Sequence, residues 1–76
     1  MRDVHEIIVE NLKGRMKQQR MSRNDLAEKA GISCRQLSNI LARLASPKLH
    51  TLQNLAAALD ITLVELMTDG FAETQV

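Results

Sequence analysis

The sequence predicts an all-α fold, a compact five-helix bundle that contains a helix-turn-helix. A length of 76 residues suits a single small domain. Apolar residues recur three and four positions apart along the chain, without the alternation typical of strands. A glycine, Gly31, separates two short amphipathic segments, as in a tight helix-helix corner. We expect residues 1–70 to form the domain and residues 71–76 to form a flexible tail.

The first two helices are predicted from one apolar stripe and one capping signal. Val4, Ile8, Leu12 and Met16 lie four apart, which predicts a helix over roughly residues 4–19. The segment Ser22-Arg-Asn-Asp25 resembles a capping box and starts a second, short helix. That helix should end at Gly31, because glycine adopts the left-handed conformation at least cost.

Three more helices follow. Ser33-Cys-Arg-Gln36 reads as another capping box and starts a third helix that runs to about Leu44. Pro47 then disfavours helix at the residue before it. The segment Thr62-Leu-Val-Glu65 is a further capping box and begins a last short helix, which holds Val64, Leu66 and Met67. The fourth helix carries apolar residues at helical spacing: Leu49, Leu52, Leu55, Ala56 and Leu59.

The third helix has two different faces. At about 100° per residue, the apolar Leu37, Ile40, Leu41 and Leu44 share one face. The opposite face is polar, and arginine and asparagine side chains can pair with guanine and adenine in the major groove of DNA. We therefore expect the apolar face to anchor the helix and the other face to read bases. The candidate base-contacting residues are Ser33, Cys34, Arg35, Gln36, Ser38 and Asn39.

The charge is concentrated in the middle of the chain. Nine lysines and arginines but only two acids lie between residues 13 and 48, a net charge of +7, although the whole chain carries only +1. Such a basic segment favours binding to a polyanion. Polar and basic residues near the ends of the two motif helices are candidate phosphate contacts: Arg20, Ser22, Arg23, Arg43, Ser46 and Lys48.

No arrangement of residues typical of catalysis is present. His5 and His50 have no carboxylate or nucleophile at meaningful spacing, and Cys34 has no second metal ligand near it in the sequence. We expect no enzyme activity, cofactor, metal or small-molecule ligand. No apolar run is long enough to cross a membrane, and a single cysteine suits a reducing cytoplasm.

Several short motifs together resemble a known family, the Cro/cI-type (XRE) helix-turn-helix regulators of bacteria and phages, over residues 11–69. The matching motifs are Asn11-Leu12, Met21-Ser22, Leu26-Ala27, Gly31-Ile32-Ser33, Leu37-Ser38-Asn39-Ile40-Leu41, Ser46-Pro47 with Leu49, Thr51-Leu52, and Leu55-Ala56-Ala57-Ala58-Leu59. The resemblance implies a lambda-repressor-like domain with its third helix in the major groove. It places base contacts at Cys34, Arg35 and Asn39.

The chain departs from the family pattern at four positions, the first of which is Arg15, where an apolar residue is usual. Arg23 stands where glutamine is common, and Arg20 where glycine is frequent. The loop after the third helix usually starts with glycine, but here it starts with Arg43. A residue other than glycine at that point favours a longer third helix.

The resulting hypothesis is a sequence-specific regulator of double-stranded DNA. We expect a repressor that occupies a pseudo-palindromic operator as a homodimer, with a seam that involves Leu63, Met67 and Phe71. The alternative is a helix-turn-helix module for protein interaction, either antitoxin-like or docking on another regulator. Exposure of Leu41 and Leu44 would favour it. An RNA-binding module is disfavoured, because Phe71 is the single aromatic residue available for base stacking.

Overall fold

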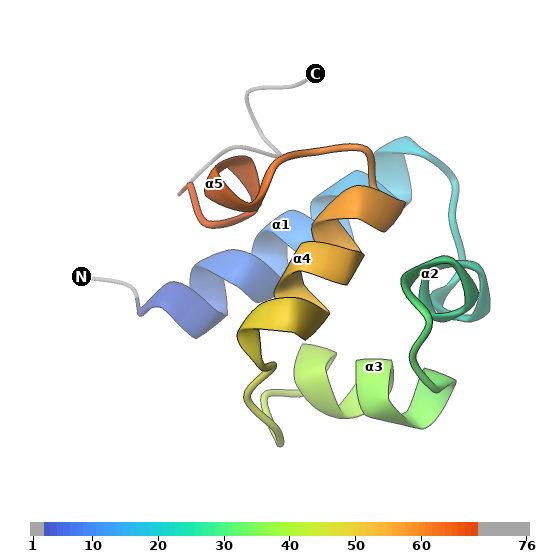
Figure 1. Cartoon of the computed structure of the whole chain (residues 1–76), viewed down its shortest axis with the longest axis horizontal. Coiled ribbons are helices and arrows are strands. Elements are labelled where there is room, and N and C mark those ends of the chain that lie inside the picture. The colour runs from blue at the N-terminus through green and yellow to red at the C-terminus, as the bar shows by residue number, and fades with distance from the viewer. Residues whose placement is uncertain (1–2, 69–76) are drawn as a thin grey trace.

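Short helices joined by tight turns make up the chain. The structure is a computed structural model that describes residues 3–68. All regular elements within that range are helical, which confirms the predicted all-α bundle (Figure 1). The predicted tail over residues 71–76, including Phe71, lies outside the described residues. The helices are α1 (Val4–Gln18), α2 (Arg23–Ala30), α3 (Cys34–Leu41), α4 (Leu49–Ala58) and α5 (Leu63–Leu66).

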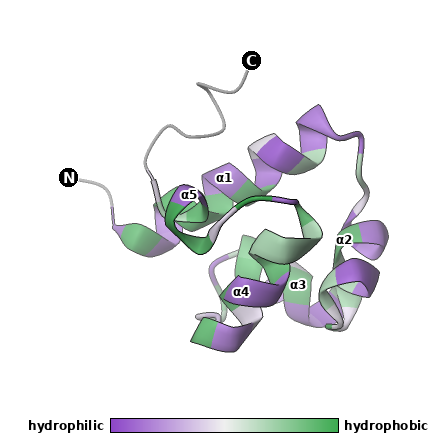
Figure 2. Cartoon of the chain, turned by 45° about the horizontal axis from the view of Figure 1, so that its top comes forward, coloured by the Kyte–Doolittle hydropathy of each residue, from purple (hydrophilic) through white to green (hydrophobic). Residues whose placement is uncertain are grey.

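A single core is shared by all five helices. α2 packs against both α3 and α4, α1 packs against α3 and α5, and α5 also contacts α4. α3 lies along one edge of the molecule, and α5 lies on the opposite side (Figure 1). Hydrophilic residues cover most of α2 and the carboxyl-terminal half of α1 (Figure 2). Each helix contributes one completely buried leucine: Leu12, Leu26, Leu37, Leu55 and Leu66.

Each of the three capping signals lies at the start of a helix, as predicted, and two of them form complete capping boxes. Ser22 with Asp25, and Thr62 with Glu65, form reciprocal capping boxes. Hydrogen bonds from the backbone and hydroxyl of Ser22 lower the pKa of the Asp25 carboxyl. The Ser33 hydroxyl accepts the backbone N–H of Gln36 at 3.0 Å, but the Gln36 side chain returns no bond to any described residue. The prediction of a full box there was wrong, because this side chain lines a hollow beside α4 instead.

The first four helices end in the same kind of turn. A residue in the left-handed region follows each helix, and the N–H of the next residue bonds back to a carbonyl five positions earlier. Gly31 has φ 74° and confirms the predicted end of α2. Three other left-handed positions hold residues other than glycine: Arg20 (φ 53°), Arg43 (φ 63°) and Asp60 (φ 60°).

α3 is shorter than predicted. It ends at Leu41 rather than near Leu44, because the Leu44 N–H bonds to the Asn39 carbonyl at 2.9 Å and closes the turn. Arg43 adopts the left-handed conformation despite its side chain, so the expectation that a residue other than glycine would lengthen the helix was also wrong.

Leu44 is 79% exposed, although it was predicted on the apolar face of α3. In this type of turn the residue after the left-handed position usually packs on the residue whose carbonyl it caps. At the other three turns the residue that supplies the carbonyl is apolar: Met16, Ala27 and Ala56. The residues that follow the left-handed positions there, Met21, Ile32 and Ile61, are partly buried against the core. In α3 the residue that supplies the carbonyl is the polar Asn39, so Leu44 has no apolar neighbour at that position of the turn.

Leu49 and Val64 lie in the helices predicted for them, but both side chains are exposed. Leu49 is 62% exposed and Val64 is 75% exposed. Each lies in the first turn of its helix, where the helix begins at the edge of the molecule. The remaining apolar positions predicted for α4, namely Leu52, Leu55, Ala56 and Leu59, are buried.

A buried asparagine connects α1 to the end of α5. Asn11 in α1 is only 2% exposed, and its Nδ2 donates to the carbonyl oxygens of Leu66 at 2.7 Å and Thr68 at 2.8 Å. Carbonyls at the end of a helix have no partner within it. Asn11 therefore satisfies the end of α5 and holds it against α1.

We predict that Asn11→Ala lowers the free energy of unfolding by about 1–3 kcal/mol, because it leaves buried carbonyl groups without a donor. Chemical denaturation followed by circular dichroism measures this change. Asn54→Ala, at an exposed position of α4, is the matched control and should change stability much less. Equal losses in the two variants would contradict the anchoring role of Asn11.

Candidate nucleic-acid interface

α3 presents a polar face to solvent and buries an apolar one. Leu37, Ile40 and Leu41 are buried, which confirms three of the four residues predicted on the anchoring face. Among the predicted base contacts, Ser33, Cys34, Arg35 and Gln36 are exposed, and Ser38 and Asn39 are half-buried. Four of the six residues are therefore exposed at the amino-terminal end of α3, and the other two are half-buried one turn further along.

Ser22 and Ser33, the N-cap residues of α2 and α3, can each still donate a hydrogen bond through the hydroxyl proton. The hydroxyl oxygens of Ser22 and Ser33 each accept a backbone N–H at the start of a helix. A hydroxyl can accept one bond and still donate another. Both serines can therefore cap a helix and donate to an anion at the same time.

Arg23 links the start of α2 to the outer side of α3. Its Nη1 lies 3.5 Å from Ser38 Oγ, which is the long limit of a hydrogen bond. The remaining guanidinium donors have no bond to a described residue. Arg23 thus lies beside the predicted reading face with donors available for an anion.

The loop after α3 is tied to the start of α1. Arg43 Nη2 and Asp3 Oδ2 form an ion pair at 2.7 Å, and both side chains are about half exposed. His5 Nε2 lies 3.3 Å from the Ile40 carbonyl oxygen. The N–H of Glu6 and, after it, the nearby Arg43 charge lower the pKa of the Asp3 carboxyl. Sequence reasoning missed this pair, because 40 residues separate its members.

A small hollow of about 210 Å³ lies between α3, the following loop and the start of α4. Lys48 occupies the N-cap position of α4, and its side chain makes no capping bond. Thr51 in the first turn is only 3% exposed, and its hydroxyl bonds to no described residue. Free N–H groups at a helix start attract anions. The hollow is lined by Gln36, Ile40, Ala45, Ser46, Pro47, Lys48, His50 and Thr51.

His50 and Thr51 were not among the predicted site residues. The available signal was the lack of a capping residue before α4, since lysine cannot accept a bond from the first N–H groups. The hollow places both beside Ser46 and Lys48, which were predicted.

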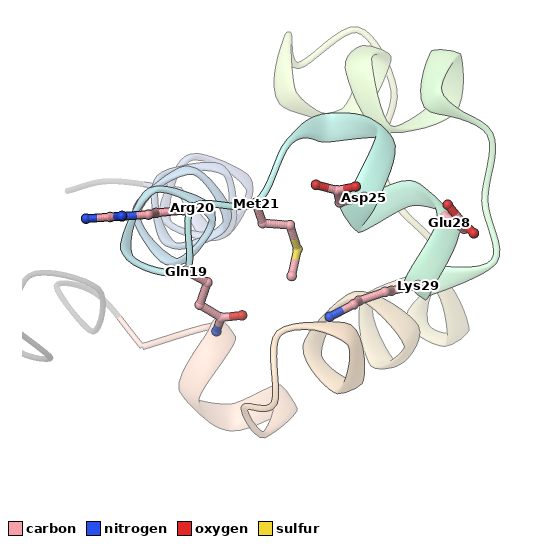
Figure 3. A pocket seen from close by; sticks show the side chains of 6 residues that line it. All are labelled: Gln19, Arg20, Met21, Asp25, Glu28 and Lys29. Carbon is pink, nitrogen blue, oxygen red and sulfur yellow. The ribbon is translucent and has the colours of Figure 1, made fainter.

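Arg20 lies in the turn between α1 and α2. An open groove of about 510 Å³ runs between the end of α1 and α2, lined by Gln19, Arg20, Met21, Asp25, Glu28 and Lys29. Figure 3 shows the Arg20 side chain extending away from α2, on the far side of the end of α1. The Arg20 side chain therefore points away from the helix that carries Arg23.

Comparison with known families identifies the fold. A model of the helix-turn-helix family matches residues 12–66, from the middle of α1 to the end of α5. The chain belongs to the Cro/C1-type (XRE) helix-turn-helix family. This is a family of DNA-binding transcription regulators that are typically not enzymes. None of the curated proteins matches the chain.

Other classes of site find no support in the described part of the chain. No three histidine, cysteine or acidic side chains among residues 3–68 come together as metal ligands. The helices described there are all too short or too polar to cross a membrane.

Proposed function

We propose that this chain is a sequence-specific repressor of transcription that occupies a DNA operator with α3 in the major groove. The observation that carries the proposal is the division of α3 into a buried apolar face and an exposed polar one. Membership of a family of DNA-binding regulators supports it. A helix of about α3's diameter fits the major groove of B-DNA.

Arg35 is the leading candidate for base discrimination. It is exposed and lies four residues, about one helical turn, before Asn39. Both side chains can form two hydrogen bonds with one base edge. Asn39 is half-buried and so has less freedom to reach a base. Ser33, Cys34, Gln36 and Ser38 complete the proposed base-contacting surface.

The proposed phosphate contacts flank this surface. Ser22 and Arg23 lie at the start of α2, and Arg43, Ser46 and Lys48 lie in the loop after α3. The uncapped start of α4, with Thr51 in its first turn, adds backbone donors next to Lys48. Arg20 completes the proposed set from the turn between α1 and α2.

We predict that Arg35→Ala weakens binding to a DNA site obtained by in vitro selection by about 1–3 kcal/mol, the contribution of one bidentate base contact. Binding to a scrambled duplex should barely change. The measurement is a mobility-shift titration of both duplexes at one salt concentration. Circular dichroism is the fold control, because residue 35 is exposed and makes no contribution to the core.

The outcome for Arg35 separates three possibilities. Loss on the selected duplex alone supports base reading. Equal loss on both duplexes would make Arg35 a phosphate contact. No loss on either would mean that this face does not read DNA.

We predict that Arg23→Ala weakens binding to selected and scrambled duplexes alike. It should also flatten the log–log dependence of affinity on salt by about 0.9, the value for one phosphate contact. Titrations at several salt concentrations measure the slope. An unchanged slope would remove Arg23 from the phosphate-contacting set.

High affinity requires two copies, since one domain of this size reads few base pairs. We predict a two-fold dimer on half-sites about one helical turn apart. Met67 is 41% exposed at the end of α5 and suits the proposed seam, whereas Leu63 is partly buried against the core. Sedimentation should show two protomers on each selected duplex; a single protomer there would contradict the dimer.

A protein-interaction module is the second candidate function. The exposed Leu44 favours it, whereas Leu41 is buried and does not. Mobility shifts with random duplexes, single strands and RNA distinguish the two. Binding to none of these nucleic acids would leave the interaction module as the better account.

A further inference from the structure

Arg43, one of the proposed phosphate contacts, already forms an ion pair with the carboxylate of Asp3. Arg43 Nη2 donates to Asp3 Oδ2 at 2.7 Å. The pair lies at the surface, with exposed fractions of 47% for Arg43 and 59% for Asp3. An approaching phosphate therefore meets a guanidinium that is accessible but already paired.

The Asp3 carboxylate is fixed in place by its second oxygen. Oδ1 accepts the backbone N–H of Glu6 at 2.8 Å, so Asp3 is also the N-cap of α1. Each oxygen thus has a separate partner, and turning toward either one would cost the bond to the other. The bond from the Glu6 N–H lowers the pKa of Asp3 further below neutrality, so the carboxylate is charged at neutral pH.

The first turn of α1 is itself held against the end of α3. His5 Nε2 lies 3.3 Å from the Ile40 carbonyl oxygen, and Ile8 and Val9 are buried in the core. Asp3 cannot withdraw from Arg43 by a movement of the helix without breaking these contacts. The Asp3 carboxylate is therefore held near the end of α3 when DNA approaches.

We propose that Asp3 is an internal competitor of DNA phosphate for Arg43 and that it lowers the affinity of the protein for every duplex. The inference rests on the proposed function, because it requires Arg43 to meet a phosphate. Two anions then share one guanidinium, and like charges at short range repel each other. The effect is independent of base sequence, because phosphates carry no sequence information.

Asp3→Asn removes the charge and keeps the cap, since asparagine is as good an N-cap residue as aspartate. We expect this variant to bind selected and scrambled duplexes about two- to fivefold more tightly, which corresponds to the coupling energy of an exposed ion pair. The matched control is Asp60→Asn. It removes one negative charge at an exposed left-handed position that asparagine tolerates, and it should change affinity less.

The role of Arg43 is tested by repeating Asp3→Asn in an Arg43→Gln background. Under the proposal the gain in affinity disappears there, because the contested guanidinium is gone. A gain of equal size with and without Arg43 would show a general charge effect and overturn the proposal. Weaker binding by Asp3→Asn would also overturn it, because Asp3 would then orient Arg43 for the phosphate.

Failure of the inference is distinguishable from failure of the proposed function. If the unsubstituted protein binds no duplex, the proposed function fails and the competition fails with it. If it binds duplexes and Arg43→Gln does not weaken that binding, only the Arg43 contact and its competitor are refuted. Thermal unfolding of all variants shows whether each remains folded at the temperature of the binding assay.

Discussion

The burial of one face of α3 is the constraint on which the rest of the structure depends. An isolated helix of eight residues is not stable in water, because it makes too few hydrogen bonds to offset nucleation. α3 persists because Leu37, Ile40 and Leu41 are buried, and each such side chain contributes about 1.5–3 kcal/mol. The same burial turns the polar residues outward. The stability of α3 and the exposure of its proposed base-contacting face therefore have one physical cause.

The ends of the helices show how the same kind of turn serves different purposes. After α1, α2 and α4 the turn brings an apolar residue against the core. After α3 the corresponding partner position is Asn39, a candidate for base contact, and Leu44 is left exposed. Arg43 holds the left-handed position of this turn, and the chain continues from it to Lys48 and the uncapped start of α4. The turn after α3 thus lacks the apolar contact of the other three turns, in the part of the chain where proposed phosphate contacts lie.

Features encoded by neighbouring residues were predictable, and those that join distant residues were not. The caps at Ser22 and the left-handed Gly31 follow from patterns a few residues long, and so does the amphipathic character of α3. The partners of Asn11 lie 55 and 57 residues away, so nothing near Asn11 in the sequence indicates them. The early end of α3 was missed because glycine usually occupies the left-handed position, whereas Arg43 adopts it here.

The central claim, that the outer face of α3 enters duplex DNA, is tested most directly through Cys34. This is the only cysteine of the chain, and it lies exposed at the start of α3. The measurement is the rate at which iodoacetamide alkylates it, with and without a saturating amount of selected duplex. The account predicts that the rate falls in proportion to the fraction of protein bound. An unchanged rate on fully bound protein would show that DNA binds elsewhere and would contradict the account.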